Sequence, residues 1–266
     1  TKADWHALGF SAPATVKAGL AELGLRPDLQ GRFEQHAGSI VRCLAQSCAP
    51  DEAFAGLRRW LDAGGAAVAP TWHEPAFLSP LCCLFAATPA LTEYFIRFPP
   101  RARAVLAPVL NVLAGGGALL QRPRFALPPE ADTAAAQLAL LRQLRIEHTL
   151  RIAGLDLLGR LPLPDTARAL SDLADACLSL ALEIAVTRLR PRMGSVQAPT
   201  GTLPFVVFAL GKLGGRELNY SSDIDLVFAY GGSGETSGAG RSVDYQTYFT
   251  ARGEEIDRIV GLEIGA

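Results

Sequence analysis

The segment "FALGKLGGRELNYSSDIDLVFAY", residues 208–230, carries the most specific pattern of this chain. It sets glycines, one lysine and two aspartates between two apolar runs. The first run, "LPFVVFAL" (203–210), is continuous and rich in Val and Phe, which predicts a strand buried on both faces. The second, "DIDLVFAY" (223–230), alternates between polar and apolar residues and predicts a neighbouring strand.

Two carboxylates share one face of the second predicted strand. The alternation places Asp223, Asp225 and Val227 on one side, and Ile224, Leu226 and Phe228 on the other. The Cα atoms of the two aspartates are then about 6.5 to 7 Å apart. From that spacing, carboxylates can converge on one divalent ion or bridge two ions about 4 Å apart. Because charge in a buried strand is costly unless a positive group lies beside it, a metal ion is the candidate partner.

A glycine-rich turn joins the two predicted strands. Gly211, Gly214 and Gly215 let the backbone approach a ligand and adopt positive φ, which favours N–H groups turned toward an anion. A phosphate suits such a loop. The spacing matches neither GxxxxGK[ST] nor GxGxxG, which excludes an ATPase P-loop and a dinucleotide-binding motif. A glycine turn or a DxD pair is weak evidence alone, but their combination on adjacent strands is more specific.

Composition excludes several classes of partner. With 25 basic and 26 acidic residues among 266, the net charge of −1 provides no global attraction to nucleic acid or anionic lipid. The opening "TKADWHALGF" lacks the pattern of a signal peptide. The most membrane-like stretch, 104–120, is interrupted by Pro108, Asn111 and three glycines and is shorter than the roughly 20 residues that a span needs. Five cysteines without a CxxC pair indicate buried thiols of a reducing compartment. We therefore expect a soluble, cytoplasmic protein.

The chain divides into two regimes of sequence pattern. Residues 1–195 are rich in Ala, Leu and Arg, with Pro and Gly at the spacing of helix boundaries, and predict a helical region. Helices are expected over 12–24, 29–48, 51–63, 75–86, 88–98, 134–161 and 166–189, the last ending at Pro191 and antiparallel to its predecessor. Residues 196–266 contain the predicted strands, and "GGSGETSGAG" (231–240) predicts a mobile loop. The fold class is therefore α+β.

The order of glycine turn and DxD strand resembles the nucleotidyltransferase superfamily of the DNA polymerase β type. Gly211, Lys212, Asp223 and Asp225 hold the places of its motif, with lysine where most members have serine. The longer string "GKLGGRELNYSSDIDLVF" is similar to the family of bifunctional glutamine synthetase adenylyltransferase/adenylyl-removing enzymes. The similarity extends upstream through "LRIAGLDLLG" and "LSDLADACLSLALE", and downstream into "GRSVDYQTYFTARGEE".

The resemblance implies an activity and a set of ligands. That family carries two nucleotidyltransferase domains in tandem, and "SSDIDL" is more similar to the amino-terminal, adenylyl-removing copy. Inorganic phosphate would attack the phosphorus of an adenylylated tyrosine on glutamine synthetase, giving ADP and the free phenol. Asp223 and Asp225 would be catalytic and would hold Mg²⁺. The implied nucleotide- and phosphate-binding residues are Gly211, Lys212, Gly214, Gly215 and Ser222. The implied partners are glutamine synthetase, a PII-type signalling protein, adenine nucleotide and phosphate.

One feature of the family is missing from the sequence. A third carboxylate, in a segment resembling RVDLRLRP, has no counterpart, since the later acidic residues stand in other contexts: Asp244, Glu254, Glu255, Asp257 and Glu263. We therefore expect the nucleotidyltransferase domain, 196–266, to be incomplete in this chain. Two further functions stay open, an ATP-dependent adenylylating domain of the same enzyme and a non-catalytic fragment that docks protein partners and senses nucleotide.

Structural roles compete with functional ones at several positions. Ser221, Ser222 and Asn219 suit a turn, and Lys212 suits a solvated surface. Arg216 and Glu217 can pair with each other or face solvent.

Overall fold

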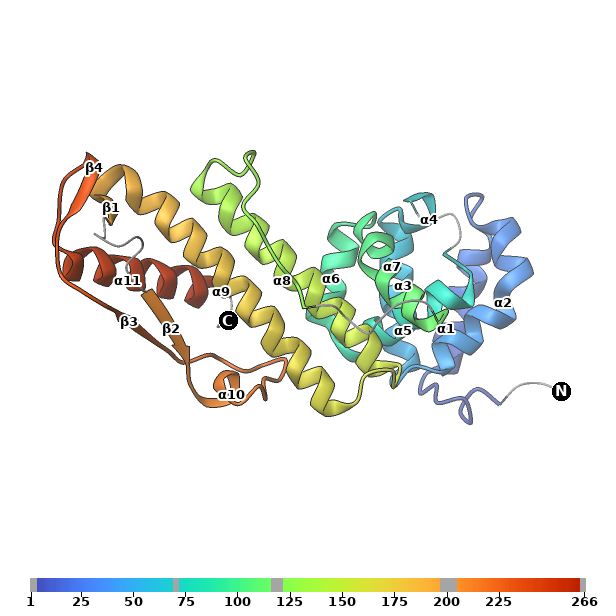
Figure 1. Ribbon diagram of the computed structural model, residues 1–266. Helices are drawn as coiled ribbons and strands as arrows, with labels where there is room; N and C mark the ends of the chain where they lie inside the picture. Colours follow the sequence, from blue (N-terminus) through green and yellow to red (C-terminus); the bar gives the residue numbers. More distant parts are fainter. Residues whose placement is uncertain (1–3, 69–71, 116–121, 197–204, 264–266) are drawn as a thin grey trace. The chain divides into compact units, whose positions relative to one another are not determined.

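The computed structural model describes residues 4–68, 72–115, 122–196 and 205–263 (Figure 1). It is mostly helical with a few short antiparallel strands, which confirms the α+β class. The helices before the first strand are α1 (Pro13–Gly24), α2 (Gln30–Ala45), α3 (Pro50–Asp62), α4 (Gly65–Val68), α5 (Pro75–Ala87), α6 (Pro89–Arg97), α7 (Arg101–Leu113), α8 (Ala134–Leu157) and α9 (Leu163–Met193). The elements that follow are β1 (Gly194–Val196), β2 (Phe205–Ala209), α10 (Gly211–Gly214), β3 (Leu226–Tyr230), β4 (Thr236–Gly240) and α11 (Tyr245–Glu263).

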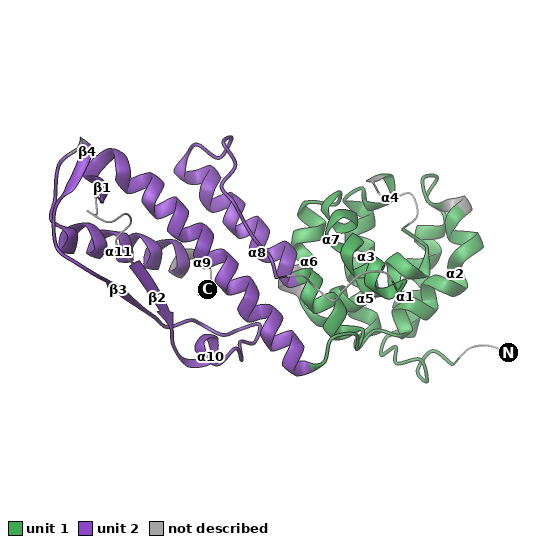
Figure 2. Ribbon diagram, viewed as in Figure 1, with its two compact units in different colours: residues 1–119, 150–162 green, residues 120–149, 163–266 purple. Residues whose placement is uncertain are grey.

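The chain forms two compact units (Figure 2). Unit 1 comprises residues 1–119 and 150–162, and unit 2 comprises residues 120–149 and 163–266. The sequence-based boundary at 195/196 was drawn from a change of sequence pattern and falls within β1, whereas the two units are defined by packing. In the ranges that the structure describes, no helix combines the length and apolar character that crossing a membrane requires.

Unit 1 is a helical assembly around buried apolar side chains. Helix α3 packs closely on α5, and Gly56 admits the Phe85 side chain at the contact. Helix α7 was not expected from the sequence, because Pro108 within it costs a backbone hydrogen bond and crowds the preceding turn. Burial of its apolar stripe opposes that cost, and the stripe consists of Ala102, Val105, Leu106 and Val109.

Unit 2 is built on the long helix α9. Its apolar side chains are buried along one stripe, in agreement with the helix predicted at 166–189, but the predicted end at Pro191 is wrong, since α9 continues to Met193. Proline has helical φ, so it can lie in a last helical turn. Near that end, Arg188 donates hydrogen bonds to the Gln137 side chain and the Ala134 carbonyl. The start of α8 thus lies beside the end of α9, as antiparallel neighbours require.

The chain after β3 differs from the prediction. The expected loop over 231–240 is wrong for Thr236–Gly240, which form β4 and pair antiparallel with β1. Helix α11 was also not expected, since its first turns are rich in aromatic and β-branched residues with weak helix propensity. It runs alongside α9 (Figure 1), and its Tyr245, Tyr248 and Phe249 form a buried cluster with Leu189 of α9.

The prediction of buried thiols is confirmed for four of the five cysteines. Cys43, Cys82, Cys83 and Cys177 are buried, whereas Cys48 is exposed, and all five are free. Burial raises the pKa of Cys83 to about 11 and that of Cys177 to about 12, so these thiols stay protonated near neutrality.

Candidate functional site

Strands β2 and β3 form an antiparallel pair that carries the candidate site. The register pairs Phe208 with Val227 and Ala209 with Leu226. The Leu210 N–H then donates to the Asp225 carbonyl at 2.9 Å, which extends the pairing by one position. Strand β3 begins at Leu226, so Asp223 and Asp225 precede the strand instead of lying within it, which corrects the predicted start.

The predicted sharing of faces is confirmed. Asp223, Asp225 and Val227 are exposed, while the residues between them, Ile224 and Leu226, are half-buried. The half-buried face packs toward α11, where Phe228 approaches Gly253 and Phe205 stacks on Phe249 with ring centroids 5.3 Å apart.

The prediction that β2 is buried on both faces is wrong. Val206 is 43% exposed and Phe208 is 54% exposed, on the same side as the carboxylates. Residues 203 and 204 of the predicted strand lie outside the described residues. Because both aspartates are exposed as well, burial alone does not require a counter-ion beside them. The case for a metal therefore rests on the arrangement of the carboxylates and on their neighbours.

The glycine turn stands directly beside one carboxylate. Gly211 has φ of +54°, and a β-carbon at that position would stand 3.6 Å from Oδ2 of Asp225. Gly214 has no positive φ, but its β-carbon would stand 2.5 Å from the Ala209 carbonyl oxygen. Gly215 has φ of −79°, so positive φ is confirmed at Gly211 and wrong at the other two glycines. Lys212, in the same turn, is exposed.

Arg216 ends the turn in an unusual conformation. Its φ of +63° is the left-handed conformation, and it is the one residue other than glycine with positive φ among those described. Its N–H donates to the Leu213 carbonyl at 3.1 Å, and the Glu217 N–H donates to the Lys212 carbonyl at 2.7 Å. These two bonds are the Schellman motif that closes a helix, in which glycine usually holds the left-handed position. For a side chain other than glycine, that conformation costs about 1 to 2 kcal/mol.

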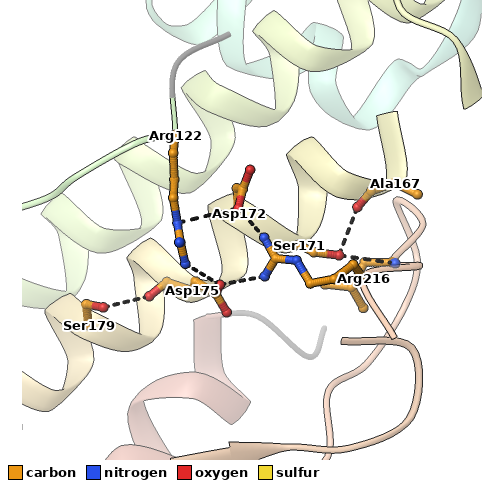
Figure 3. A network of polar contacts seen from close by, with 8 residues as sticks. Arg122, Ala167, Ser171, Asp172, Asp175, Ser179 and Arg216 are labelled. Atoms are coloured by element: carbon orange, nitrogen blue, oxygen red, sulfur yellow. Dashed lines mark hydrogen bonds and ion pairs between the residues drawn. The ribbon is translucent and has the colours of Figure 1, made fainter. Parts of the chain in front are cut away.

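A network of ion pairs joins Arg216 to α9 (Figure 3). Nη1 of Arg216 donates to Oδ2 of Asp175 at 2.6 Å, and Nη2 donates to Oδ1 of Asp172. Arg122 also donates to Oδ2 of Asp175, at 2.7 Å, and its Nε lies 3.4 Å from Oδ1 of Asp172. The sequence suggested that Arg216 pairs with Glu217 or faces solvent. Both interpretations are wrong, because Arg216 pairs with Asp172 and Asp175.

Sequence reasoning missed the aspartates of this network. Ser171, Asp172 and Asp175 occupy adjacent positions on one face of α9, since residues three and four apart on a helix are neighbours. A serine and two acids at neighbouring positions of the helix predicted over 166–189 were the available signal. Their distant partners could not be read from the sequence.

The segment between the turn and the aspartates forms a compact polar turn. The Asn219 side-chain oxygen accepts from the Ser221 N–H at 3.0 Å and from the Ser222 hydroxyl at 2.8 Å. The Asn219 N–H in turn donates to the Ser222 hydroxyl oxygen at 3.1 Å. These contacts agree with the structural role that the sequence suggested for the three residues, that of forming a turn. A role of Ser222 in binding would be additional to them.

The structure describes no third carboxylate at this site. In the described part of the chain, no group of three or more His, Cys, Asp or Glu side chains could hold a metal ion. Asp244 instead accepts from the Thr247 N–H at 2.9 Å at the start of α11, which lowers its pKa. Glu255 pairs with Arg188 and Arg258. The two aspartates remain the candidate ligands, and carboxylate oxygens suit a hard divalent ion such as Mg²⁺.

Comparison with known proteins adds independent findings. The family model described as glutamate-ammonia ligase adenylyltransferase matches residues 78–263. A protein from Pseudomonas aeruginosa named bifunctional glutamine synthetase adenylyltransferase/adenylyl-removing enzyme is 46% identical over 118 residues, which are 44% of this chain and 12% of that protein. Proteins of the same name from Burkholderia mallei and Pseudomonas syringae pv. tomato are 38% identical over 182 residues and 32% identical over 270 residues.

The matches cover much of this chain but little of each relative. The Burkholderia mallei alignment covers 66% of the chain and 18% of the relative, and the Pseudomonas syringae alignment covers 93% and 27%. Because the family model covers well over half of its residues, the chain belongs to the glutamate-ammonia ligase adenylyltransferase family.

Proposed function

We propose that this chain is part of a nucleotidyltransferase that removes AMP from adenylylated glutamine synthetase by phosphorolysis. One observation carries the proposal. Asp223 and Asp225 share an exposed face, and the Gly211 turn stands directly beside the second of them. Membership of the family and the names of the relatives, which include adenylyl removal, support the same reaction.

The chain's own residues would do the following in that reaction. The glycine turn and Lys212 orient the attacking phosphate and the adenylyl phosphate, with Ser222 as a further contact. A phosphate oxygen forms a bond to the adenylyl phosphorus while the bond from phosphorus to the tyrosine oxygen breaks. The tyrosine oxygen takes up the proton of the attacking hydrogen phosphate, and the products are ADP and the free phenol.

Asp223 and Asp225 are the residues that would hold Mg²⁺. When bound, the ion supplies positive charge that neutralises the phosphoryl oxygens and the leaving oxygen. The arrangement suits this role, since both carboxylates are exposed on one side and reach the surface where the turn lies. The family's third carboxylate is not among the described residues, and the complete site needs it as well.

The test compares variants of the full-length protein. Asp223→Asn and Asp225→Asn should lower phosphate-dependent release of ADP from adenylylated glutamine synthetase by about 100-fold or more, because each removes a charge that acts in the transition state. Asp165→Asn is the matched control, since Asp165 is an exposed aspartate of α9 that pairs with Arg168. Turnover like that of the wild type in either site variant would refute the metal assignment.

A second function uses the same site in the other direction. The description of the matching family names an adenylyltransferase, which favours ATP-dependent adenylylation of glutamine synthetase as the alternative. Incubating the protein with ATP and unmodified glutamine synthetase, and separately with phosphate and the adenylylated form, distinguishes the two directions. We propose glutamine synthetase as the protein partner and a PII-type protein as a regulator, which binding assays with each purified protein would test.

A further inference from the structure

The residue that ends the glycine turn is held by two carboxylates from a different part of the chain. The two terminal nitrogens of Arg216 each donate to one aspartate, Nη1 to Asp175 and Nη2 to Asp172 (Figure 3). The aspartates are three residues apart on α9 and therefore lie on one helical face. One guanidinium thus spans nearly a full turn of the helix. These three residues are called the α9 clamp below.

The α9 clamp is partly shielded from solvent, and Arg122 balances its charge. The side chains of Arg216, Asp172 and Asp175 are 35%, 21% and 28% exposed. Arg122, at 62% exposed, supplies a second guanidinium, so two positive charges face two negative ones. Charge-assisted bonds from a forked guanidinium fix direction as well as distance. The α9 clamp is therefore able to fix the orientation of the backbone that carries Arg216.

The backbone next to Arg216 is docked on α9 a second time. The Leu218 N–H lies 3.4 Å from the hydroxyl oxygen of Ser171, and that hydroxyl donates to the Ala167 carbonyl at 2.8 Å. Leu218 itself is buried. At its other end the turn is tied to β3, since the Leu210 N–H bonds to the Asp225 carbonyl. The turn is thus fixed at one end to α9 and at the other to the strand that follows the aspartates.

The conformation of Arg216 is a second observation that points to a role for its side chain. Glycine would adopt its φ of +63° without strain, whereas arginine does so only where contacts hold it. The contacts that hold it here are the two carboxylates of α9. A residue that served only to end α10 would not need a side chain.

We propose that Arg216, Asp172 and Asp175 are positioning residues, which fix the glycine turn to α9 and so hold Gly211 in place beside Asp225 and fix the backbone of Lys212 in the same turn. The inference rests on the proposed function of that site. Arg216 acts through the backbone of the turn and does not itself touch substrate.

The test uses three substitutions of Arg216 in the full-length protein. Arg216→Gly relieves the left-handed conformation and removes the α9 clamp, Arg216→Ala removes the clamp without that relief, and Arg216→Lys keeps the charge but loses the fork. We expect kcat of the glycine and alanine variants to fall by about 10-fold to 100-fold, since small misplacement of reacting groups has effects of that size. The KM for phosphate should rise while the KM for adenylylated glutamine synthetase stays unchanged. The lysine variant should recover part of the loss.

Amide hydrogen exchange supplies a readout that is independent of activity. Exchange over residues 210–226 should accelerate in Arg216→Gly and in the double variant Asp172→Asn/Asp175→Asn, while exchange in the middle of α9 stays unchanged. The triple variant Arg216→Gly/Asp172→Asn/Asp175→Asn should exchange little faster than Arg216→Gly alone, because the three residues act as one unit. Arg168→Ala, which removes the exposed pair with Asp165 on the same helix, is the matched control and should change neither readout.

The outcomes separate this inference from the proposed function. If the glycine variant keeps the phosphate KM, kcat and exchange rates within about twofold of the wild type, Arg216 only ends a helix and the inference fails. If the wild type removes no AMP from glutamine synthetase, the proposed function fails, and the exchange measurement alone decides whether the α9 clamp holds the turn.

Discussion

Gly214 lies against the carbonyl oxygen of Ala209, so closely that a β-carbon on residue 214 would stand 2.5 Å from that oxygen. Ala209 is the last residue of β2 and is paired with Leu226, so its carbonyl is fixed by the strand pairing. Because the conflict is with backbone, no rotation of a side chain can relieve it. The glycine at this position is therefore required by the close return of the turn onto the strand.

Substitution of Gly214 by alanine should displace the turn. We expect Gly214→Ala to lower the free energy of unfolding by about 1 to 3 kcal/mol, as other overpacked sites do. Gly215→Ala is the control, since its β-carbon would stand 3.6 Å from the Glu217 carboxylate and φ is −79°. That variant should stay within about 0.5 kcal/mol of the wild type. Urea unfolding measures the free energy of unfolding of both variants. Equal losses in the two would show that the close approach of residue 214 to the Ala209 carbonyl does not matter.

A second glycine pair tests the core of unit 1. A β-carbon on Gly56 of α3 would stand 2.7 Å from two carbons of Phe85, on α5. Gly56→Ala should destabilise the protein by about 1 to 3 kcal/mol. Gly38 of α2 has no atom within 4 Å of its β-carbon position, so Gly38→Ala should stabilise by about 0.5 to 1 kcal/mol through helix propensity. Thermal unfolding of the two variants should therefore shift in opposite directions.

The sequence predicted the elements that rest on local pattern. Apolar spacing predicted the helix at 166–189, whose stripe the structure confirms although α9 continues to Met193, and alternation placed Asp223 and Asp225 on one face, which the structure also confirms. Periodicity indicates which side chains lie on the same face. That indication was correct for Asp223 and Asp225 even though both precede the strand.

Features set by contacts between distant residues were missed. The exposure of Phe208 depends on what covers the sheet, which an apolar run does not reveal. The left-handed conformation of Arg216 depends on Asp172 and Asp175, more than 40 residues earlier, so glycine was the residue expected to adopt it. Helix α11 packs its aromatic residues on Leu189, and this tertiary contact outweighs their weak helix propensity.

His73 should make unit 1 sensitive to acid. Its imidazole stacks on His36 with ring centroids 4.2 Å apart, and its Nδ1 is buried without a hydrogen-bond partner in the described ranges. Burial lowers the pKa of His73 below 6.5, His36 and Arg32 lower it further, and Glu74 opposes them. The unfolded chain therefore takes up this proton more readily than the folded protein. Stability from neutral His73 is complete above pH 6.5 and is lost as the pH falls through its lowered pKa.

Replacing the imidazole of His73 by a ring that does not titrate tests whether His73 causes the acid sensitivity. His73→Phe keeps an aromatic ring against His36, and its urea midpoint should fall less than that of the wild type between about pH 7 and pH 5. His6→Gln is the control, because His6 contacts the Phe10 carbonyl near the start of the chain. If the urea midpoint of His73→Phe falls with decreasing pH as steeply as that of the wild type, other groups cause the acid sensitivity.

Two arginines of unit 2 should respond oppositely to the same substitution. Arg188 donates to Glu255 at 2.7 Å and to Gln137 at 3.0 Å, and its side chain is 16% exposed. Arg252 lies over the Phe205 ring at 4.2 Å, and its Nε is buried without a partner among the described residues, so burial lowers its pKa. Arg188→Met should lower the free energy of unfolding by about 1.5 to 3 kcal/mol, because it breaks charge-assisted hydrogen bonds. Arg252→Met keeps most of the side-chain volume and removes a poorly compensated charge, so it should be neutral or stabilising by about 1 kcal/mol. Urea unfolding at neutral pH measures both, and a loss in Arg252→Met as large as in Arg188→Met would show that the contact with Phe205 outweighs the cost of burying the guanidinium.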